Sequence, residues 1–193
     1  MTNLHDLFSK RLDGSLAAIA STRQCISQIV TMAQIIRDRL SAGGTLYTCG
    51  NGGSAAEALH LAEELTGRYR ETRPPLRAVC LNADPTALTC IANDFGFEEV
   101  FARPCDALLT PRDALLAFST SGESQNIIRA LQVARQRGAA ALALLGRSGG
   151  RSIDVCDHAV VVRIADSAHV QETHQVIMHM LCEALEQPAA QNR

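Results

Sequence analysis

The sequence predicts an α/β fold: a three-layer α/β/α sandwich around a five-stranded parallel sheet, with a helical extension at the amino terminus. From residue 45 onward, short apolar runs alternate with helical patterns. Runs this apolar, separated by helices, are typical of parallel strands that helices cover on both faces. At 193 residues the chain is long enough to bury a sizeable core, and we expect one domain over residues 1–193.

The first forty or so residues have helical periodicity. Their apolar positions are Leu4, Leu7, Phe8 and Leu12, followed by Ile26, Ile29, Val30, Ala33, Ile36 and Leu40. The pattern stops at Ala42-Gly43-Gly44, a sequence typical of a helix end. We therefore expect a helical hairpin over residues 1–42, an α/β core over 43–187 and a frayed tail over 188–193.

Five apolar runs are predicted to form the strands of the core. They are Thr45–Cys49, Leu76–Leu81, Ala114–Phe118, Ala139–Leu145 and Ala159–Ile164. Helical patterns follow the first four runs, and a last helix is predicted from about Val170 to Glu186. Ligands of open parallel sheets bind beyond the carboxyl ends of the strands, so the loops after these runs are the expected place for a site.

Composition and charge disfavour several classes of function. The net charge of −2, from 18 basic and 20 acidic residues, offers no basic field for nucleic acid and no polybasic stretch for lipid. No apolar run approaches the length of a membrane span, and the amino terminus lacks the pattern of a signal peptide. Seven cysteines without a C-x-x-C motif are expected to be reduced core residues. We expect a cytoplasmic protein without a nucleic-acid or membrane partner.

Two strand-to-helix loops share a composition suited to an anion. They are Gly50-Asn51-Gly52-Gly53-Ser54 after the first strand and Ser119-Thr120-Ser121-Gly122-Glu123-Ser124 after the third. Glycines permit close approach of backbone amides, hydroxyls donate to anionic oxygens, and a helix amino terminus favours a phosphate. For one such loop alone, helix capping is the better explanation, but four Ser/Thr residues within six positions favour phosphate for the second.

The first loop also matches the G-x-G-x-x-A pattern of dinucleotide-binding proteins, at Gly50, Gly52 and Ala55. The acidic residue that this pattern needs would be Asp84, which lies farther on than the usual spacing of roughly 20 residues. No Gly-Lys-Ser/Thr of a P-loop occurs in the chain. A phosphorylated metabolite is therefore the better candidate ligand.

Two predicted helices carry side chains suited to a metal ion or a proton relay. His60 and Glu64 share one face of the helix after the glycine loop. The last helix interrupts its apolar pattern at Gln171, Glu172, His174, Gln175 and His179. Positions 171 and 179 differ by about 80° around a helix, so both can face one neighbour. Two histidines and a carboxylate suit zinc, with a Gln oxygen as a weaker ligand.

Spacing alone leaves alternatives open at these helices. For any one of these polar residues, an exposed or hydrogen-bonded helical residue is the better interpretation, and spacing does not choose between His174 and His179. Asn93 and Asp94, which follow the second predicted strand-helix unit, could reach a polyol or could simply end a helix before a glycine turn.

Taken together, four segments resemble the sugar isomerase (SIS) domain, and specifically the sedoheptulose 7-phosphate isomerases, or phosphoheptose isomerases. These segments are GNGGSAAEALHLAEELTGRYR, ANDFGF, FSTSGES and VQETHQVIMH. They occur in the expected order between about Gly43 and Glu186. The combination is specific, whereas STSG alone marks only the wider sugar-phosphate-binding domain.

The resemblance implies a site, a cofactor and an assembly. Its metal set falls on His60, Glu64, Gln171 and His179, with one Zn²⁺ per subunit. Its phosphate-binding residues fall on Ser119, Thr120, Ser121 and Ser124. Its other substrate contacts fall on Asn51, Gly52, Gly53, Glu64, Asn93, Asp94 and Gln171. It also implies a homotetramer with active sites at subunit interfaces, which would bring the two metal-binding helices together.

The implied reaction is the isomerisation of sedoheptulose 7-phosphate to D-glycero-D-manno-heptose 7-phosphate through an enediol(ate), in the synthesis of heptose precursors. Glu64 would be the general base and His179 the acid. Glu123, where Asn is common in the family, and the segment 165–169 depart from the family pattern. Two rivals are a SIS-domain protein that works by contact with a replication initiator, whose relatives lack the carboxylate matching Glu64, and a sugar-phosphate sensor.

Overall fold

The computed structural model describes residues 3–187 and contains one five-stranded sheet. Its strands are β1 (Leu46–Gly50), β2 (Ala78–Cys80), β3 (Ala114–Ser119), β4 (Ala140–Gly146) and β5 (His158–Val162). They lie in the order β2-β1-β3-β4-β5, and every neighbouring pair is parallel. The predicted parallel sheet is therefore confirmed, with each strand within a few residues of its expected place.

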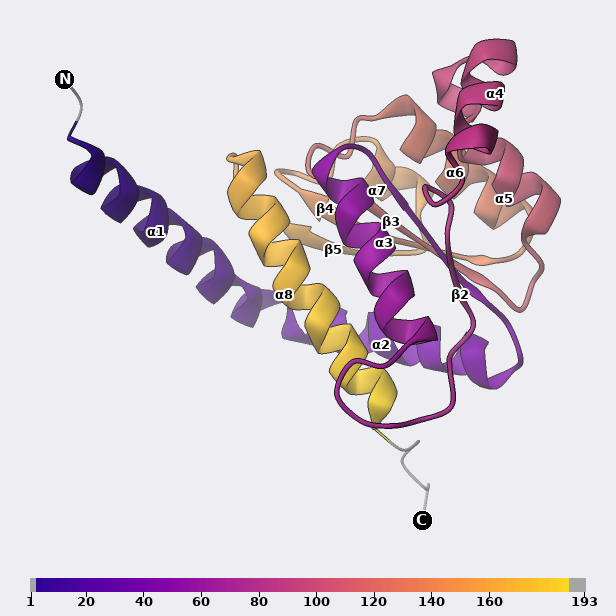
Figure 1. Ribbon diagram of the computed structural model, residues 1–193, viewed down its shortest axis with the longest axis horizontal. Coiled ribbons are helices and arrows are strands. Elements are labelled where there is room, and N and C mark those ends of the chain that lie inside the picture. The colour runs from indigo at the N-terminus through magenta and orange to yellow at the C-terminus, as the bar shows by residue number, and fades with distance from the viewer. Residues whose placement is uncertain (1–2, 188–193) are drawn as a thin grey trace.

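Helices connect the strands and cover both faces of the sheet (Figure 1). They are α1 (Leu4–Ser21), α2 (Ile26–Ser41), α3 (Gly53–Thr66), α4 (Pro85–Phe95), α5 (Ala102–Leu108), α6 (Gln125–Gln136), α7 (Ser152–Val155) and α8 (Ser167–Glu186), with short 3₁₀ turns η1 (Thr22–Cys25) and η2 (Phe97–Glu99). Asp166 caps the amino end of α8 by accepting hydrogen bonds from two backbone amides, and Asp84 caps α4 in the same way.

The core has two halves because side chains alternate across the sheet. In β3, Leu116 and Phe118 pack with α2, α3 and α8, whereas Leu115 and Ala117 pack with α5 and α6 on the other face. All six residues of β3 and all seven of β4 are buried. The predicted three-layer sandwich is confirmed by these two halves.

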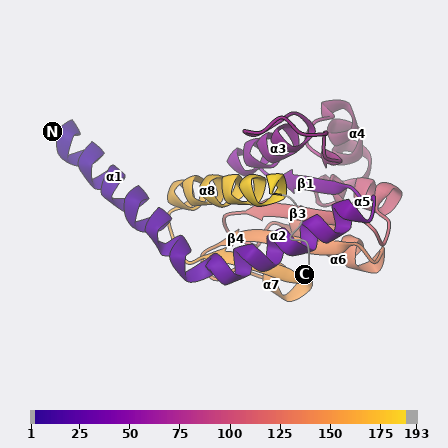
Figure 2. The same ribbon diagram turned by 90° about the horizontal axis from the view of Figure 1, so that it is seen from below.

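The strand order places the predicted loops at one point of the sheet. The chain moves outward from β1 to β2 and returns to β3 on the other side of β1. The loops after β1 and β3 therefore diverge from neighbouring strands, which is the switch point where open sheets bind ligands. Helix α3 starts from the first of these loops and lies beside α8 (Figures 1 and 2).

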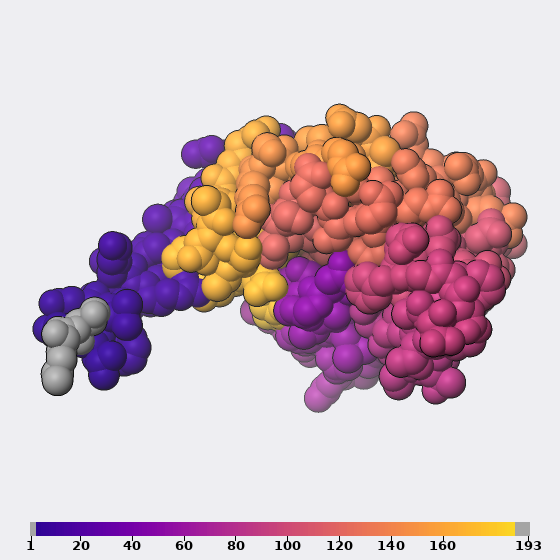
Figure 3. Space-filling view, turned by 90° about the horizontal axis from the view of Figure 1, so that it is seen from above, coloured from indigo at the N-terminus to yellow at the C-terminus, as the bar shows by residue number. Residues whose placement is uncertain are grey.

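The predicted hairpin over residues 1–42 is wrong in its geometry, although both of its helices exist. Helix α2 packs on β5 and α8, and α1 continues away from it beyond η1 rather than folding back along it (Figures 1 and 2). In the space-filling view the amino-terminal part of α1 projects beyond the body, while its later turns contact α8 (Figure 3). Its apolar stripe, Leu4, Leu7, Phe8, Leu12 and Leu16, is exposed. The periodicity marked a face that needs a partner, and α2 is not that partner.

Two further expectations concern membrane-spanning helices and the carboxyl-terminal tail. None of the helices within residues 3–187 has the length and apolar character needed to span a bilayer. The predicted frayed tail, residues 188–193, lies outside the residues that the structure describes.

Candidate functional site

The glycine loop makes a tight turn from β1 into α3. A side chain at Gly50 would place its Cβ 2.3 Å from the carbonyl oxygen of Ser54, so only glycine fits there. Gly52 has a positive φ of 57°, which also favours glycine. The loop therefore brings bare backbone, including the amides at the start of α3, to the switch point. Such amides are suited to an anionic ligand.

The loop of residues 119–124, which follows β3 and is called the serine loop below, keeps two of its hydroxyls free. Ser119 Oγ accepts a hydrogen bond of 3.0 Å from the Gly122 amide, and Ser121 Oγ accepts one of 3.1 Å from the Glu123 amide. These bonds shape the loop before α6 begins. Within residues 3–187, the partly exposed hydroxyls of Thr120 and Ser124 have no hydrogen-bond partner. They are available to an incoming phosphate.

A pair of asparagines joins the two loops. The side-chain amides of Asn51 and Asn126 donate to each other's oxygens at 2.9 Å in both directions. Asn126 is buried and lies at the start of α6, so the bridge fixes the spacing of the loops. A cavity of about 530 Å³ opens beside them, lined by Asn51, Phe97, Glu98, Ser124, Gln125 and Asn126. Sequence reasoning missed Asn126, whose only signal was its place at a helix start.

A cluster of metal-ligating side chains lies between α3 and α8. His60 Nε2 is 3.1 Å from Glu64 Oε1 on the same helix. His179 of α8 meets His60 edge to face, with ring centroids 5.4 Å apart. One ligand atom from each of the three residues lies within 4.8 Å of the others, and all three are partly exposed. Two imidazoles and a carboxylate at this spacing match the donor set of a zinc site.

Gln175 is part of this cluster, and its role was not predicted. Its Nε2 lies 2.6 Å from His60 Nδ1 and 3.5 Å from His179 Nε2. Turning the amide by 180° exchanges its nitrogen and oxygen, so it can serve a ring N–H equally well. The signal was present in the sequence, since Gln175 lies four residues before His179 and hence on the same helical face. Tyr69 adds a second contact by stacking on the His179 ring at 5.4 Å.

The line of contact between α3 and α8 is called the α3–α8 seam below. Gln171 lies at the other end of this seam from the three-residue cluster. A Cβ built at Gly53 would meet the Gln171 side chain at 2.4 Å, so this amide rests on the first turn of α3. The structure thus brings Gln171 to the glycine loop, while Gln175 contacts the two histidines. Gln171 remains a predicted metal ligand, but in this conformation its side chain is engaged at Gly53.

Asn93 and Asp94 lie on the last turn of α4 and are exposed. Asn93 Nδ2 donates to Asp94 Oδ1 at 2.8 Å. No residue of α4 is buried, and the helix packs mainly against η2. Their predicted role in contacting substrate stays a prediction.

The two helices that carry the cluster meet within a single chain. Helices α3 and α8 lie side by side on one face of the sheet, and the His60–Glu64–His179 cluster bridges them. A subunit interface was expected to bring these side chains together, and that expectation is corrected here. Packing of both helices on one sheet is sufficient to do so.

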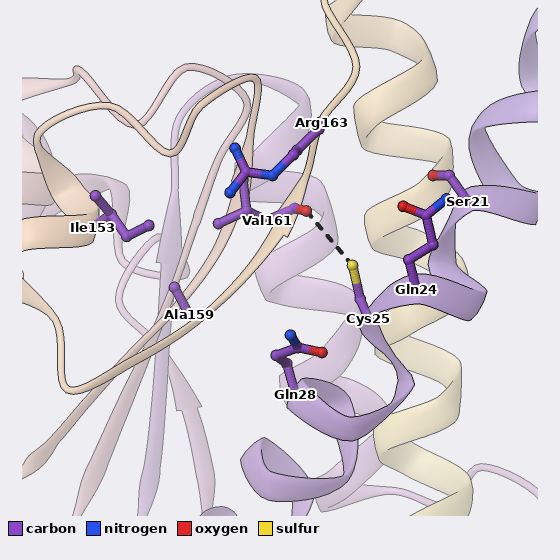
Figure 4. Close-up of a pocket in the computed structure, with 8 residues that line it drawn as sticks. All are labelled: Ser21, Gln24, Cys25, Gln28, Ile153, Ala159, Val161 and Arg163. Atoms are coloured by element: carbon purple, nitrogen blue, oxygen red, sulfur yellow. Dashed lines mark hydrogen bonds between the residues drawn. The ribbon is translucent and has the colours of Figure 1, made fainter.

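A separate hollow lies on the β5 side of the sheet (Figure 4). It has a volume of about 500 Å³ between η1, α2 and β5, where Cys25 Sγ donates to the carbonyl of Val161 at 3.6 Å. Its lining contains none of the predicted site residues: Ser21, Gln24, Cys25, Gln28, Ile153, Ala159, Val161 and Arg163. The candidate site is the α3–α8 seam and its loops, where the chemistry-bearing residues gather.

Comparison with known proteins agrees with this geometry. The family model of the SIS domain matches residues 10–146. A phosphoheptose isomerase from a Nitratiruptor species is 45% identical over 159 residues, 82% of this chain and 85% of that protein. One from Campylobacter concisus is 38% identical and covers 95% of this chain and 97% of that protein. The solved structure of a phosphoheptose isomerase from Francisella tularensis has a TM-score of 0.93 at 31% identity, covering 97% of this chain and 100% of that one.

Proposed function

Because this chain belongs to the phosphoheptose isomerases of the SIS-domain family and is an isomerase, we propose that it converts sedoheptulose 7-phosphate to D-glycero-D-manno-heptose 7-phosphate. This reaction moves a carbonyl group from C2 to C1 of one sugar phosphate and supplies heptose precursors. The site must therefore hold a phosphate at one end and exchange protons at the other.

The observation that carries the proposal is the meeting of His60, Glu64 and His179 within 4.8 Å on adjacent helices. A ketose–aldose isomerisation needs one group that removes the C1 proton and one that delivers a proton at C2. Glu64 is the proposed base and His179 the proposed acid. A binding protein or sensor would need neither a carboxylate nor an imidazole at the carbonyl end of the ligand.

The phosphate end is assigned to the serine loop. The free hydroxyls of Thr120 and Ser124, with Ser119 and Ser121 shaping the turn, offer donors at the amino end of α6. Binding energy from this remote group can hold C1 and C2 against the acid–base pair. The polyol between them would be contacted by Asn51, Gly52, Gly53, Asn93, Asp94 and Gln171.

The donor set of the seam fits a divalent metal ion, which we propose to be one Zn²⁺ per subunit. His60, Glu64 and His179 would hold it, with a Gln amide oxygen, from Gln171 by family resemblance, as a fourth donor. Because a carboxylate bound to a cation is a poorer base, Glu64 would hold the ion in one state and accept the C1 proton in another. When bound, such an ion stabilises negative charge on a substrate oxygen. His60 orients the carboxylate of Glu64 at 3.1 Å.

We also propose that the protein is a homotetramer in the cytoplasm, and the exposed apolar stripe of α1 supports assembly of the chain. Leu12 is 59% exposed and Leu16 58% exposed, on a helix that extends from the body (Figure 3). A contiguous apolar helical face of this kind is typical of an interaction site. We propose that other copies of the chain cover it, and that active sites lie near the resulting interfaces.

Incubation of the purified protein with sedoheptulose 7-phosphate, followed by ¹H NMR, tests the function. The expected result is an aldose heptose 7-phosphate that forms quickly without additive and slowly after chelation. Binding of the sugar phosphate without any interconversion, in metal-loaded protein, would favour the sensor instead.

A further inference from the structure

Two buried titratable side chains that the proposed chemistry does not use face each other between α3 and α8. Glu57 is 6% exposed and His174 is 0% exposed. His174 Nδ1 lies 4.0 Å from Glu57 Oε2. Within residues 3–187, neither carboxyl oxygen and neither ring nitrogen has a hydrogen-bond partner of normal geometry. Unpaired polar atoms are costly to bury, so these two groups are expected to satisfy each other.

Their surroundings favour the uncharged form of both groups. Burial raises the pKa of Glu57 to about 8, against a smaller opposing effect of the Ser54 hydroxyl. Burial lowers the pKa of His174 to about 4, against an opposing effect of the Leu145 carbonyl. At neutral pH the pair is a carboxylic acid beside a neutral imidazole, which avoids the cost of a buried charge.

The charged side chains of α1 and α2 that reach α8 are engaged elsewhere: Arg11 donates to Glu172 and His169, and Arg37 donates to the Ala184 carbonyl. Strands β1, β3 and β4 carry no charged residue. Phe118 of β3 stands edge-on to the His174 ring, with centroids 6.3 Å apart. The other titratable residues near them on the two helices are partly or fully exposed, namely His60, Glu63, Glu64, His169, Glu172 and His179.

The position of the ring favours one placement of its proton. Nδ1 is the nitrogen paired with Glu57, at 4.0 Å from Oε2, so a bond between them needs the side chains to approach by about 1 Å. The Leu145 carbonyl, near the end of β4, can accept only from a ring N–H. We propose that the Glu57 carboxyl donates to His174 Nδ1 while His174 Nε2–H donates to the Leu145 carbonyl, and that this relay positions α3 and α8 for the acid–base site. The positioning role rests on the proposed function.

The position of the relay explains why it would affect catalysis. Glu57 lies one helical turn before His60 and two turns before Glu64. His174 lies between Gln171 and His179 on α8. A bond between them fixes the separation of the two helices midway between the glycine loop and the cluster. Partners of this kind typically change metal affinity or activity by roughly 10- to 100-fold when they are removed.

Histidine-selective ¹⁵N NMR on the wild-type protein tests the pairing without any variant. The expected signature is a His174 ring that stays in the neutral Nε2–H tautomer from about pH 5.5 to 8, with a hydrogen-bonded Nδ1. A ring that titrates near its ordinary pKa of about 6.5, or an Nδ1–H tautomer, would overturn the proposal. In Glu57→Met the Nδ1 resonance should move to the position of an unbonded nitrogen, and an unchanged resonance would contradict the pairing.

Two variants of Glu57 test the positioning role. Glu57→Gln keeps a neutral donor and should retain kcat within about 3-fold, whereas Glu57→Met, of similar length without a donor, should lose about 10-fold or more in kcat with little change in KM. Competition with a chromophoric chelator should show about 10-fold weaker Zn²⁺ binding for Glu57→Met only. Wild-type kcat and Zn²⁺ affinity in Glu57→Met would refute positioning. If the wild type fails to isomerise the sugar, the NMR and Zn²⁺ readouts still decide the relay separately.

Discussion

Replacing Glu64 by Gln should separate catalysis from stability. In the wild type, Glu64 Oε1 lies 3.1 Å from His60 Nε2. Gln has nearly the same size as Glu and keeps an oxygen near that nitrogen. The His60–Glu64 pair is an i,i+4 pair with side chains 37% and 16% exposed, so its loss costs at most about 0.5 kcal/mol. For a chain of this size that is a fall of about 1–2 °C in Tm. Loss of the base should lower kcat by roughly 10²- to 10⁴-fold.

The assay is NMR-monitored turnover of sedoheptulose 7-phosphate, with Tm and bound metal measured on the same preparation. Glu63→Gln is the matched control, because it removes the same charge from the adjacent, exposed position of α3. The control should keep wild-type turnover. If Glu64→Gln, loaded with metal and free of wild-type protein, turns over within about 10-fold of the wild type, Glu64 is not the base.

Three other expectations follow from the same geometry. Thr120→Val, which breaks no internal hydrogen bond, should raise KM about 10-fold or more with kcat nearly unchanged in steady-state kinetics, while Thr31→Val, at an exposed position of α2, should change neither. The double replacement Leu12→Glu and Leu16→Glu should dissociate the oligomer, as measured by light scattering. Because both side chains are exposed on the single chain, the free energy of unfolding of that chain should stay almost unchanged. An intact assembly would refute the role of α1. The pKa of Glu57 is raised to about 8 in the folded protein, so its contribution to the stability of the protein is lost as pH rises from about 4.5 to 8. The pKa of His174 is lowered to about 4, so its contribution is lost in the other direction, as pH falls from 6.5 to 4. The two slopes offset each other below about pH 6.5, so urea unfolding should show a loss of about 1–2 kcal/mol between about pH 6.5 and 8 in the wild type and a flatter profile in Glu57→Gln.

The sequence was sufficient for the sheet because its strands are nearly free of polar residues. Segments such as 114–118 and 139–145 are buried on both faces, a pattern typical of parallel strands under two helical layers. His60 and Glu64 were also accessible from sequence, since i,i+4 spacing on one helix fixes their proximity whatever the tertiary fold.

Relations between elements were less predictable, because local spacing does not determine how one helix is rotated against another. The contacts of Gln175 with His60, and of Glu57 with His174, depend on the rotation of α8 against α3. The hairpin failed for a related reason: an amphipathic stripe indicates that α1 has an apolar face, but not which surface covers it.

Isomerisation in D₂O tests the central claim most directly, because it follows the hydrogen that Glu64 is proposed to remove. If Glu64 takes the C1 proton and His179 delivers another at C2, the aldose formed by the wild type should carry solvent deuterium at C2. Glu64→Gln should neither form product nor exchange the C1 hydrogen of the ketose. Product from the wild type whose C2 hydrogen is the one removed from C1 of the ketose, without deuterium from solvent, would indicate direct transfer and contradict the acid–base account.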